Sequence, residues 1–202
     1  MKHVPVLLMD TYYEALDEPH VSMDDIMAGK IATQYVIGKG HKRIGGVFKL
    51  DDSQGSRRYF GFLEAMNEAS LRVTGNDLLW FDTVDIENEE NVRQLAERIR
   101  KRLSTRTALV LYNDESAYKL INEFNKMGLK IPDDISIVGI DDTVLSTNGT
   151  VQITSVAYPT EEIAVKAANN LLELIKNGRF DATYEFSVHI VERDSVKDLT
   201  DN

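Results

Sequence analysis

Three polar stretches in the sequence follow apolar runs, and their side chains are suited to binding hydroxyl groups. The stretches read KLDD at 49–52, YND at 112–114 and GIDD at 139–142, and two arginines follow the first stretch at 57–58. Carboxylate and amide oxygens accept hydrogen bonds from hydroxyls, and an arginine supplies a planar fork of donors. This mixture suits a neutral polyol or sugar better than an anion. Turn and helix-cap chemistry explains each stretch taken singly, so the prediction depends on the three lying together.

Other kinds of site find little support in the sequence. The chain has no cysteine, which excludes thiolate nucleophiles and thiolate metal ligands. Its four histidines are far apart, and neither a nucleophile elbow nor a P-loop motif is present. Pairs of carboxylates could act as acids and bases, although turns and caps also favour them; they lie at 24–25, 51–52, 133–134 and 141–142. We therefore predict no metal, no cofactor and no enzymatic activity.

Composition bounds the class of protein. The 202 residues are 43% hydrophobic and 28% charged, with a formal net charge of −10, which is typical of one large globular domain or two small lobes. The negative charge argues against a nucleic-acid-binding surface on this chain, because such a surface needs clustered positive charge. No apolar run is long enough to cross a membrane, and the first residues do not form a signal peptide. We therefore predict a cytoplasmic protein without membrane contacts.

Short apolar runs alternate with amphipathic segments along the chain. The spacing predicts strands at 4–9, 43–50, 78–81, 108–112, 135–140 and 184–191, and helices at 24–38, 56–69, 88–103, 113–128 and 159–175. This order predicts an α/β fold, with a parallel sheet covered by helices on both faces. In such folds ligands lie beyond the carboxyl ends of the strands. Because the three polar stretches stand at strand ends, we expect them to converge on one crevice.

Several longer motifs resemble those of the LacI/GalR transcriptional regulators. They occur in order across nearly the whole chain and read DDIMAGKIATQYVIGKGHKRIGGV, RRYFGF, YNDESA, GLKIPDDISIVGIDD, ITSVAYP and RDS. The resemblance implies the type I periplasmic-binding-protein fold, in which two doubly wound lobes of parallel sheet hold an effector in the cleft between them.

The resemblance also implies how the chain is divided. Residues 1–40 and 156–178 would form an incomplete N-terminal lobe, and residues 41–155 and 179–202 the C-terminal lobe. Members of the family begin with further strands and helices upstream of the run at 4–9, so the chain is expected to be truncated at its N-terminus. Operator DNA would be bound only through a domain absent from this chain, and the full-length protein would be a homodimer.

Three family positions imply direct contacts to the effector. The arginine of R-x-x-G-F, the asparagine of N-D-x-x-A and the first acid of G-x-D-D correspond to Arg58, Asn113 and Asp141. All three would hold effector hydroxyls by hydrogen bonds, and two of them carry a charge that strengthens such bonds.

The loop ahead of this arginine implies further contacts. Asp52 and Gln54 lie at positions that touch effector in some members, and Lys49 and Asp51 are further candidates from the same loop. The resemblance is greatest to the arabinose-responsive branch, which joins a GntR-type winged-helix head to a LacI-type sugar domain. The implied effector is therefore L-arabinose, and sugar binding would relieve operator binding.

Two other functions share this fold class. A sugar-binding protein of a transporter would carry an export signal, and a sugar-processing enzyme would turn over its bound sugar. The missing export signal and the regulator motifs favour an effector domain of a repressor over both.

Overall fold

The computed structural model divides into two compact units, and it describes residues 4–13, 15–178 and 181–200. The large unit runs from Asp25 to Ala157 and continues from His189 onward. The small unit takes the described residues before Asp25 together with Tyr158–Val188. The chain therefore passes between the units three times.

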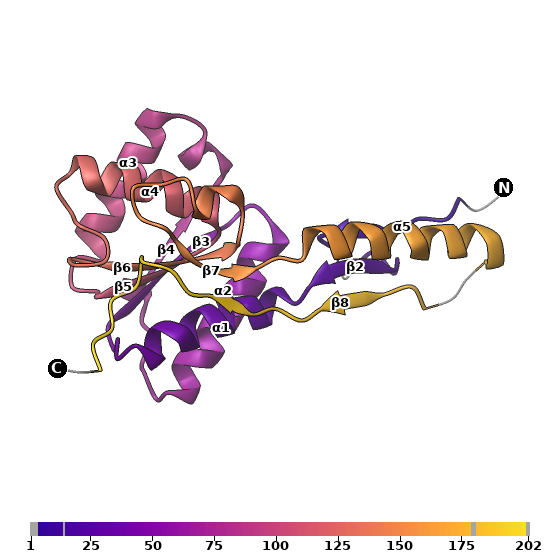
Figure 1. Cartoon of the computed structure of the whole chain (residues 1–202), viewed down its shortest axis with the longest axis horizontal. Coiled ribbons are helices and arrows are strands. Elements are labelled where there is room, and N and C mark those ends of the chain that lie inside the picture. The colour runs from indigo at the N-terminus through magenta and orange to yellow at the C-terminus, as the bar shows by residue number, and fades with distance from the viewer. Residues whose placement is uncertain (1–3, 14, 179–180, 201–202) are drawn as a thin grey trace. The chain divides into compact units, whose positions relative to one another are not determined.

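A six-stranded sheet forms the centre of the large unit (Figure 1). In spatial order its strands are β4 (Leu78–Phe81), β3 (Ile44–Lys49), β5 (Ala108–Leu111), β6 (Ser136–Asp141), β7 (Thr154–Ala157) and β9 (Ile190–Val191). Neighbouring strands are parallel except β7 with β9. The chain leaves β3 toward β4 on one side and then crosses back to β5 on the other. The winding direction therefore changes between β3 and β5, which is where ligands bind in open sheets of this kind.

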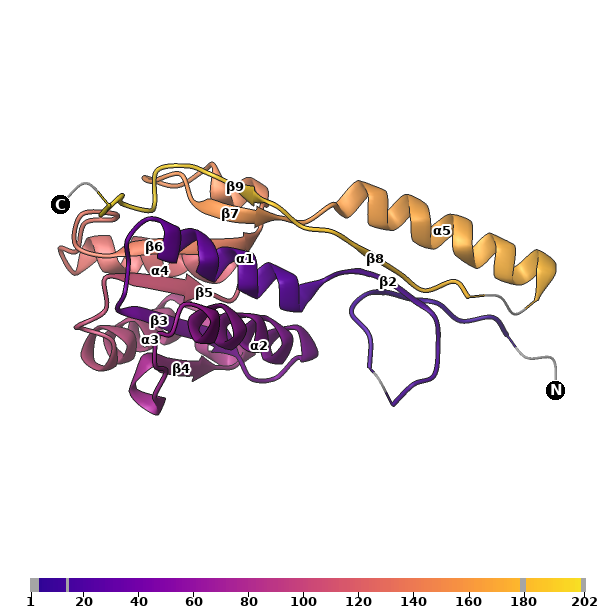
Figure 2. The same cartoon turned by 90° about the horizontal axis from the view of Figure 1, so that it is seen from below.

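Helices cover both faces of this sheet (Figures 1 and 2). On one face lie α1 (Asp25–Gly38) and α2 (Ser53–Glu68), and on the other lie α3 (Glu89–Arg102) and α4 (Asp114–Lys126). The connecting loops contain the 3-10 turns η1 (Gly75–Asp77), η2 (Thr83–Ile86) and η3 (Val144–Ser146). The predicted α/β class with parallel sheets is confirmed.

The main hydrophobic core lies between the six-stranded sheet and the helices α3 and α4. Leu95 and Ile99 of α3 are buried there with Leu109 of β5 and Phe124 of α4. Acidic residues occupy the first turn of α3 and basic residues its last turn, an order that suits the helix dipole. The amphipathic pattern of the sequence thus predicted both the helix and its buried face.

Two glycines allow α1 and α2 to pack closely. A Cβ atom at Gly29 would lie 2.0 Å from the carbonyl oxygen of Arg58, and one at Gly61 would lie 1.9 Å from that of Ile26. Because both neighbours are backbone atoms, a side chain fits only if one helix moves. This contact fixes the position of α2, which carries Arg58.

We expect Gly61→Ala to lower the free energy of unfolding by about 1–3 kcal/mol, because overpacking forces backbone shifts. Urea denaturation followed by far-UV circular dichroism measures the change. Gly38→Ala is the matched control, because a Cβ atom there meets nothing within 4 Å; this variant should be as stable as the parent or slightly more stable. An equal loss in both variants would contradict the packing account.

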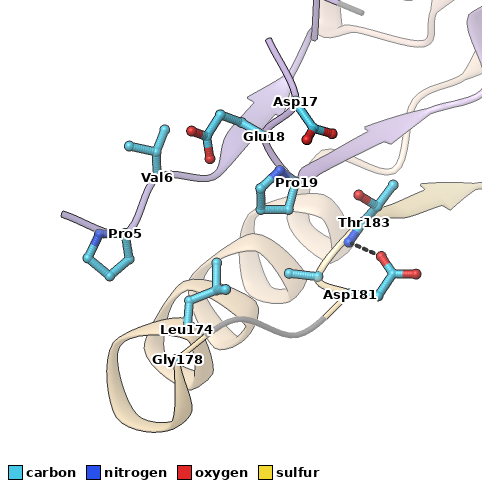
Figure 3. A pocket seen from close by; sticks show the side chains of 10 residues that line it. Pro5, Val6, Asp17, Glu18, Pro19, Leu174, Gly178, Asp181 and Thr183 are labelled. Carbon is cyan, nitrogen blue, oxygen red and sulfur yellow. Dashed lines mark hydrogen bonds between the residues drawn. The ribbon is translucent and has the colours of Figure 1, made fainter. Parts of the chain in front are cut away.

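The small unit combines a three-stranded parallel sheet with one long helix. Its strands, in spatial order, are β1 (Leu8–Asp10), β2 (His20–Met23) and β8 (Tyr184–Phe186). The helix α5 (Thr160–Asn177) packs on this sheet through Ile163, Ala167 and Leu174. Near its carboxyl end, a hollow of about 600 Å³ is lined by Pro5, Val6, Pro19 and other residues of the small unit (Figure 3).

The structure divides the chain differently from the predicted boundaries. Residues 25–40, which were predicted to belong to the N-terminal lobe, pack in the large unit, because Ala28 and Ala32 of α1 are buried there against its neighbours. Residues 181–188, which were predicted to belong to the C-terminal lobe, pack in the small unit. The predicted strand at 184–191 therefore becomes β8 and β9, which lie in different units because the chain passes between them after Val188. The strands β2 and β7 were not predicted.

In the described part of the chain, no helix has both the length and the apolar character needed to span a bilayer. Nor do these residues hold a cluster of three or more histidine and acidic side chains that could bind a metal ion.

Candidate functional site

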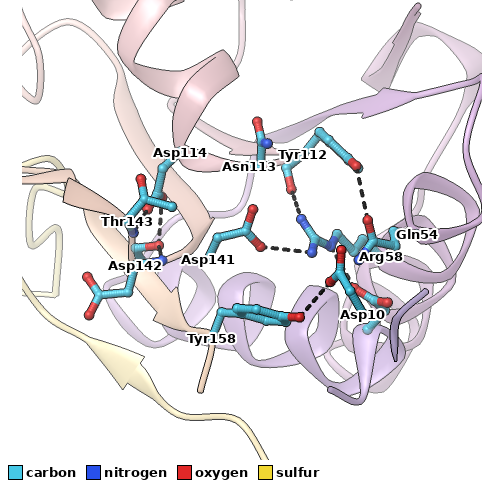
Figure 4. A network of polar contacts seen from close by, with 12 residues as sticks. Asp10, Gln54, Arg58, Tyr112, Asn113, Asp114, Asp141, Asp142, Thr143 and Tyr158 are labelled. Atoms are coloured by element: carbon cyan, nitrogen blue, oxygen red, sulfur yellow. Dashed lines mark hydrogen bonds and ion pairs between the residues drawn. The ribbon is translucent and has the colours of Figure 1, made fainter. Parts of the chain in front are cut away.

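The polar ends of the strands β3, β5 and β6 lie next to one another in the large unit. These strands are adjacent and parallel, and the residues at or just after their carboxyl ends are Lys49, Tyr112 and Asp141. Tyr112 and Asp141 both face Arg58 (Figure 4). Arg58 from the second turn of α2 contacts two of these strand ends directly. The structure therefore brings together groups that are 92 positions apart between the first and the last strand end, from 49 to 141.

Arg58 is the centre of the arrangement. Its side chain is almost fully buried. Nε donates to Oδ1 of Asp25 at 2.8 Å, Nη1 donates to the carbonyl oxygen of Tyr112 at 2.7 Å, and Nη2 donates to Oδ1 of Asp141 at 2.8 Å. Burial lowers the pKa of Arg58, but the charges of Asp141 and Asp25 outweigh it and raise the pKa above its ordinary value. The guanidinium thus remains charged and joins α1, β5 and β6.

Asp25 belongs to the carboxylate pair at 24–25, for which the sequence left both acid–base and cap roles open, and it is the buried partner of Arg58. It lies in the first turn of α1 and is almost fully buried. Burial raises its pKa to about 6, although the charge of Arg58 and its hydrogen bond act in the opposite direction. An ion pair of this kind needs both members, because removing either leaves an uncompensated charge in the interior.

Asp141 is the part of this network that is open to solvent. Its side chain is 21% exposed, whereas that of Arg58 is 2% exposed. Its backbone has φ of 105°, and the next residue, Asp142, has φ of 48°. Two consecutive residues with Cβ atoms in this region are uncommon, and such conformations persist only where surrounding contacts hold them.

A second cluster of hydrogen bonds holds this turn. The Asp114 side chain, which is fully buried, accepts from Ser155 Oγ at 2.6 Å and from the Thr143 amide at 2.8 Å. The amide of Asp142 donates to Ser155 Oγ at 3.1 Å. Arg193 Nη2 donates to Asp142 Oδ1 at 2.6 Å. Burial raises the pKa of Asp114 to about 7, against the effect of its two hydrogen bonds.

Asp52, Gln54 and Lys49 surround the hydroxyl of Tyr112. Asp52 caps α2 by accepting from the Gly55 amide at 2.7 Å, and its other oxygen accepts from the Tyr112 hydroxyl at 2.6 Å. That hydroxyl lies 3.4 Å from Gln54 Oε1, and Lys49 Nζ lies 3.2 Å from the Asp52 carboxylate. The four side chains form one connected polar group.

Asp51 and Asn113 are engaged in local structure. Asp51 is exposed and accepts from the amide of Thr83 at 3.1 Å, which ties the loop after β3 to the loop after β4. Asn113 caps α4, and its side-chain oxygen accepts from the Ser116 amide at 2.9 Å. The structure therefore groups Arg58 and Asp141 in one cluster and Asp52, Gln54 and Lys49 in another.

Tyr112 links the Arg58–Asp141 cluster to the cluster of Asp52, Gln54 and Lys49, and it was not among the predicted residues. Its carbonyl oxygen accepts from Arg58, its hydroxyl donates to Asp52, and the Arg58 guanidinium lies 4.9 Å from the centre of its ring. The sequence places it at the end of an apolar run, so that it reads as a core residue, and its 6% exposure agrees with that reading. The sequence did contain a signal that Tyr112 takes part in the polar network: it stands at the end of β5, between the polar ends of the neighbouring strands β3 and β6.

Comparisons with known proteins identify the family. The sequence matches the model of the periplasmic binding protein-like domain over residues 33–196. Arabinose metabolism transcriptional repressors from Geobacillus stearothermophilus and Halalkalibacterium halodurans are 34% and 30% identical to it over 201 and 188 residues. These alignments cover 98% and 93% of this chain but 55% and 50% of the repressors. A transcriptional repressor PurR from Klebsiella pneumoniae is 31% identical over 200 residues, with 98% of this chain and 58% of the repressor covered. The chain thus spans little more than half the length of these curated relatives.

Solved structures show the same fold. The transcription regulator CcpA of Lactococcus lactis superposes with a TM-score of 0.84 at 26% identity, covering 96% of this chain and 70% of CcpA. A LacI family regulator from Enterococcus faecium with bound ribose superposes with a TM-score of 0.85 at 23% identity, covering 97% of this chain and 72% of the regulator. With the family model matched over most of its length, the chain belongs to the periplasmic binding protein-like domain family, and its predicted resemblance to the effector-binding domains of LacI-type regulators is confirmed.

Proposed function

We propose that this chain is the effector-binding domain of a bacterial transcriptional repressor and that its large unit binds a neutral sugar at the carboxyl ends of β3, β5 and β6. One observation carries the proposal: a buried arginine, Arg58, holds the partly exposed carboxylate of Asp141 at the end of a central strand. A carboxylate fixed in this way accepts strongly from a sugar hydroxyl, because little conformational freedom is lost when the sugar binds.

The charge around these strand ends supports an uncharged ligand. The acidic side chains there are Asp25, Asp51, Asp52, Asp114, Asp141 and Asp142, and the basic ones are Lys49, Arg57, Arg58 and Arg193. Lys49, Arg58 and Arg193 form ion pairs with carboxylates, and the charge of Arg57 acts on Asp25. An anionic ligand would therefore meet an excess of negative charge, whereas hydroxyl groups match the acceptors on Asp141 and Asp52.

L-Arabinose is the first sugar to consider, because two repressors of arabinose metabolism are among the curated relatives. Other effectors come next, since PurR repressors match to a similar extent and related regulators have been solved with ribose and with cellobiose. In this proposal Arg58, Asp141, Asp52 and Gln54 form the polar wall of the site. Asn113, Lys49 and Asp51 contribute at its edge.

Sugar binding would act on operator DNA through a domain outside this chain. The physical content is a coupling free energy between two sites, typically about 1–3 kcal/mol. We further propose that the whole protein is a cytoplasmic homodimer without enzymatic activity. A transporter sugar-binding protein is the alternative, but the curated relatives described above are repressors.

Isothermal titration calorimetry tests the proposal with L-arabinose, D-ribose, D-xylose, D-glucose and cellobiose, and with inorganic phosphate and ribose 5-phosphate as charged probes. We expect at least one neutral sugar to bind, and the two anions to bind at least tenfold more weakly. Asp141→Ala should reduce the affinity for that sugar about tenfold or more, because a hydrogen bond to a charged group is worth about 1.5–3 kcal/mol.

The matched control is Asp133→Ala, which removes an exposed carboxylate from the loop that precedes β6. This variant should bind the sugar like the parent protein. Binding of phosphate in preference to every neutral sugar, or equal affinities in the two variants, would overturn the assignment of the site.

A further inference from the structure

The turn that carries Asp141 has an uncommon backbone conformation, and a fully buried carboxylate, that of Asp114, holds it. Asp141 and Asp142 both have positive φ, of 105° and 48°. Residues with a Cβ atom leave this region unless neighbouring contacts hold them there. The direction of the Asp141 side chain depends on this turn, because Asp141, which pairs with Ala157, is the last residue of β6 in its ladder with β7.

The contacts that hold the turn converge on Asp114, at the start of α4 (Figure 4). The Thr143 amide donates to Asp114 Oδ2 at 2.8 Å, and Ser155 Oγ donates to Asp114 Oδ1 at 2.6 Å. Ser155 Oγ in turn accepts from the Asp142 amide at 3.1 Å. Two successive amides of the turn therefore end on one carboxylate, the first through a serine and the second directly.

The local structure leaves room for this carboxylate and for little else. Gly139 lies beneath it on β6, and a Cβ atom there would be 2.3 Å from Asp114 Oδ1. No basic side chain donates to Asp114 in its described hydrogen bonds, which are both to turn or strand residues. On the outer side of the turn, Arg193 and Ser146 donate to Asp142 Oδ1 at 2.6 and 3.2 Å. The turn is thus held from within by Asp114 and from outside by Arg193.

We propose that Asp114 is a positioning residue for the candidate site: it holds the 141–142 turn through Ser155 and the Thr143 amide, and so keeps the Asp141 carboxylate beside Arg58, where a sugar hydroxyl can donate to it. The part of this proposal that concerns sugar rests on the proposed function. The part that concerns the turn does not, and the two can be tested separately.

The test of the turn needs no ligand. Hydrogen exchange of backbone amides, followed by NMR, should be at least tenfold faster at both Asp142 and Thr143 in Asp114→Ala. In Ser155→Ala it should be faster at Asp142 and less affected at Thr143, because only the former amide donates to the serine. Asp114→Asn should restore most of the protection, because an amide oxygen still accepts from Thr143 and its NH₂ group can donate to Ser155.

Ser195→Ala is the matched control. Ser195 is fully buried, donates to the Ile137 carbonyl oxygen near the amino end of β6, and accepts from the amide of Thr154, the neighbour of Ser155. It should lower stability as Ser155→Ala does, without changing exchange at Asp142 or Thr143. Unchanged exchange at these two amides in both Asp114→Ala and Ser155→Ala would overturn the proposal, and so would equal acceleration in Ser195→Ala.

A double-mutant cycle tests whether Asp114 acts through Asp141. With L-arabinose and D-ribose as calorimetric probes, Asp114→Ala should weaken binding at least tenfold, with Ser155→Ala weakened less. In the Asp141→Ala background, Asp114→Ala should cause no further loss, since interacting residues are not additive. A full second loss would show that Asp114 acts elsewhere. If neither sugar binds the parent protein, the proposed ligand class fails, while the exchange data still decide the role of Asp114.

Discussion

Replacing Arg58 with methionine should destabilise the large unit by about 3–5 kcal/mol, the cost of breaking a buried ion pair from one side. The substitution keeps an unbranched, flexible stem but removes the guanidinium, and with it the donors to Asp25, Tyr112 and Asp141. Asp25 is then left buried without its counter-charge. Urea denaturation at several pH values measures the loss.

The loss should be larger at pH 8 than at pH 5. In the parent protein the pKa of Asp25 is already raised to about 6 by burial, against the charge of Arg58. Without that charge the pKa rises further. At pH 5 Asp25 is protonated in the folded variant, and burying the neutral carboxyl costs little. At pH 8 the folded variant must either bury an unpaired carboxylate or bind a proton at a pH where carboxyl groups are normally ionised, and both cost free energy.

Arg93→Met is the matched control. Arg93 pairs with Glu90 and Glu97 on the exposed face of α3, and surface pairs of this kind are worth about 0–1 kcal/mol. A loss below about 1 kcal/mol in Arg58→Met, or a loss that does not depend on pH, would contradict the central role of Arg58.

Much of this arrangement could be predicted because parallel topology follows from the alternation of strands and helices. Once the sheet is parallel, the stretches that end in Lys49, Tyr112 and Asp141 must lie at one edge, whatever their separation in sequence. The network around Arg58 forms at this edge. The family motif predicted the arginine itself, and the topology explains why its partners come from distant segments of the chain.

The partners themselves were not predictable in the same way. Asp25 and Asp114 have the sequence context of helix caps, and residue type alone does not show whether a carboxylate faces solvent or the interior. The predicted boundary near residue 40 was wrong for a related reason. The helix α1 carries small apolar residues such as Ala28 and Ala32, and their residue types do not show which unit the helix packs against. Packing decided its place through the close contacts at Gly29 and Gly61.

The stability of the protein should fall as the pH rises from about 4 to about 7, and Asp114 should be a principal cause. Its pKa is raised to about 7 in the folded state by burial, whereas an unfolded chain releases this proton near pH 4. Between these values the folded state binds more protons than the unfolded state, so that raising the pH favours unfolding. A difference of about three pKa units corresponds to about 4 kcal/mol.

Asp114→Asn should remove most of this dependence. The amide mimics the protonated carboxyl and does not titrate, so the variant should be more stable than the parent protein above pH 7, by up to about 4 kcal/mol, and similar to it near pH 4. Free energies of unfolding from urea titrations at pH 4, 5.5, 7 and 8 give the two profiles. Asp133→Asn, at an exposed carboxylate, should reproduce the parent profile.

The stability profile and the amide exchange of Asp114→Asn together indicate why residue 114 is an acid. An asparagine that stabilises the fold at pH 8 and yet leaves the turn protected would mean that the negative charge of Asp114 costs stability and is not needed to hold Asp142 and Thr143. An asparagine that fails to flatten the profile would instead assign the pH dependence to Asp25, whose folded pKa of about 6 acts in the same direction over a narrower range. The Arg58→Met profile separates these two carboxyls, because Arg58 contacts Asp25 directly, whereas Asp114 is held by Ser155 and the Thr143 amide.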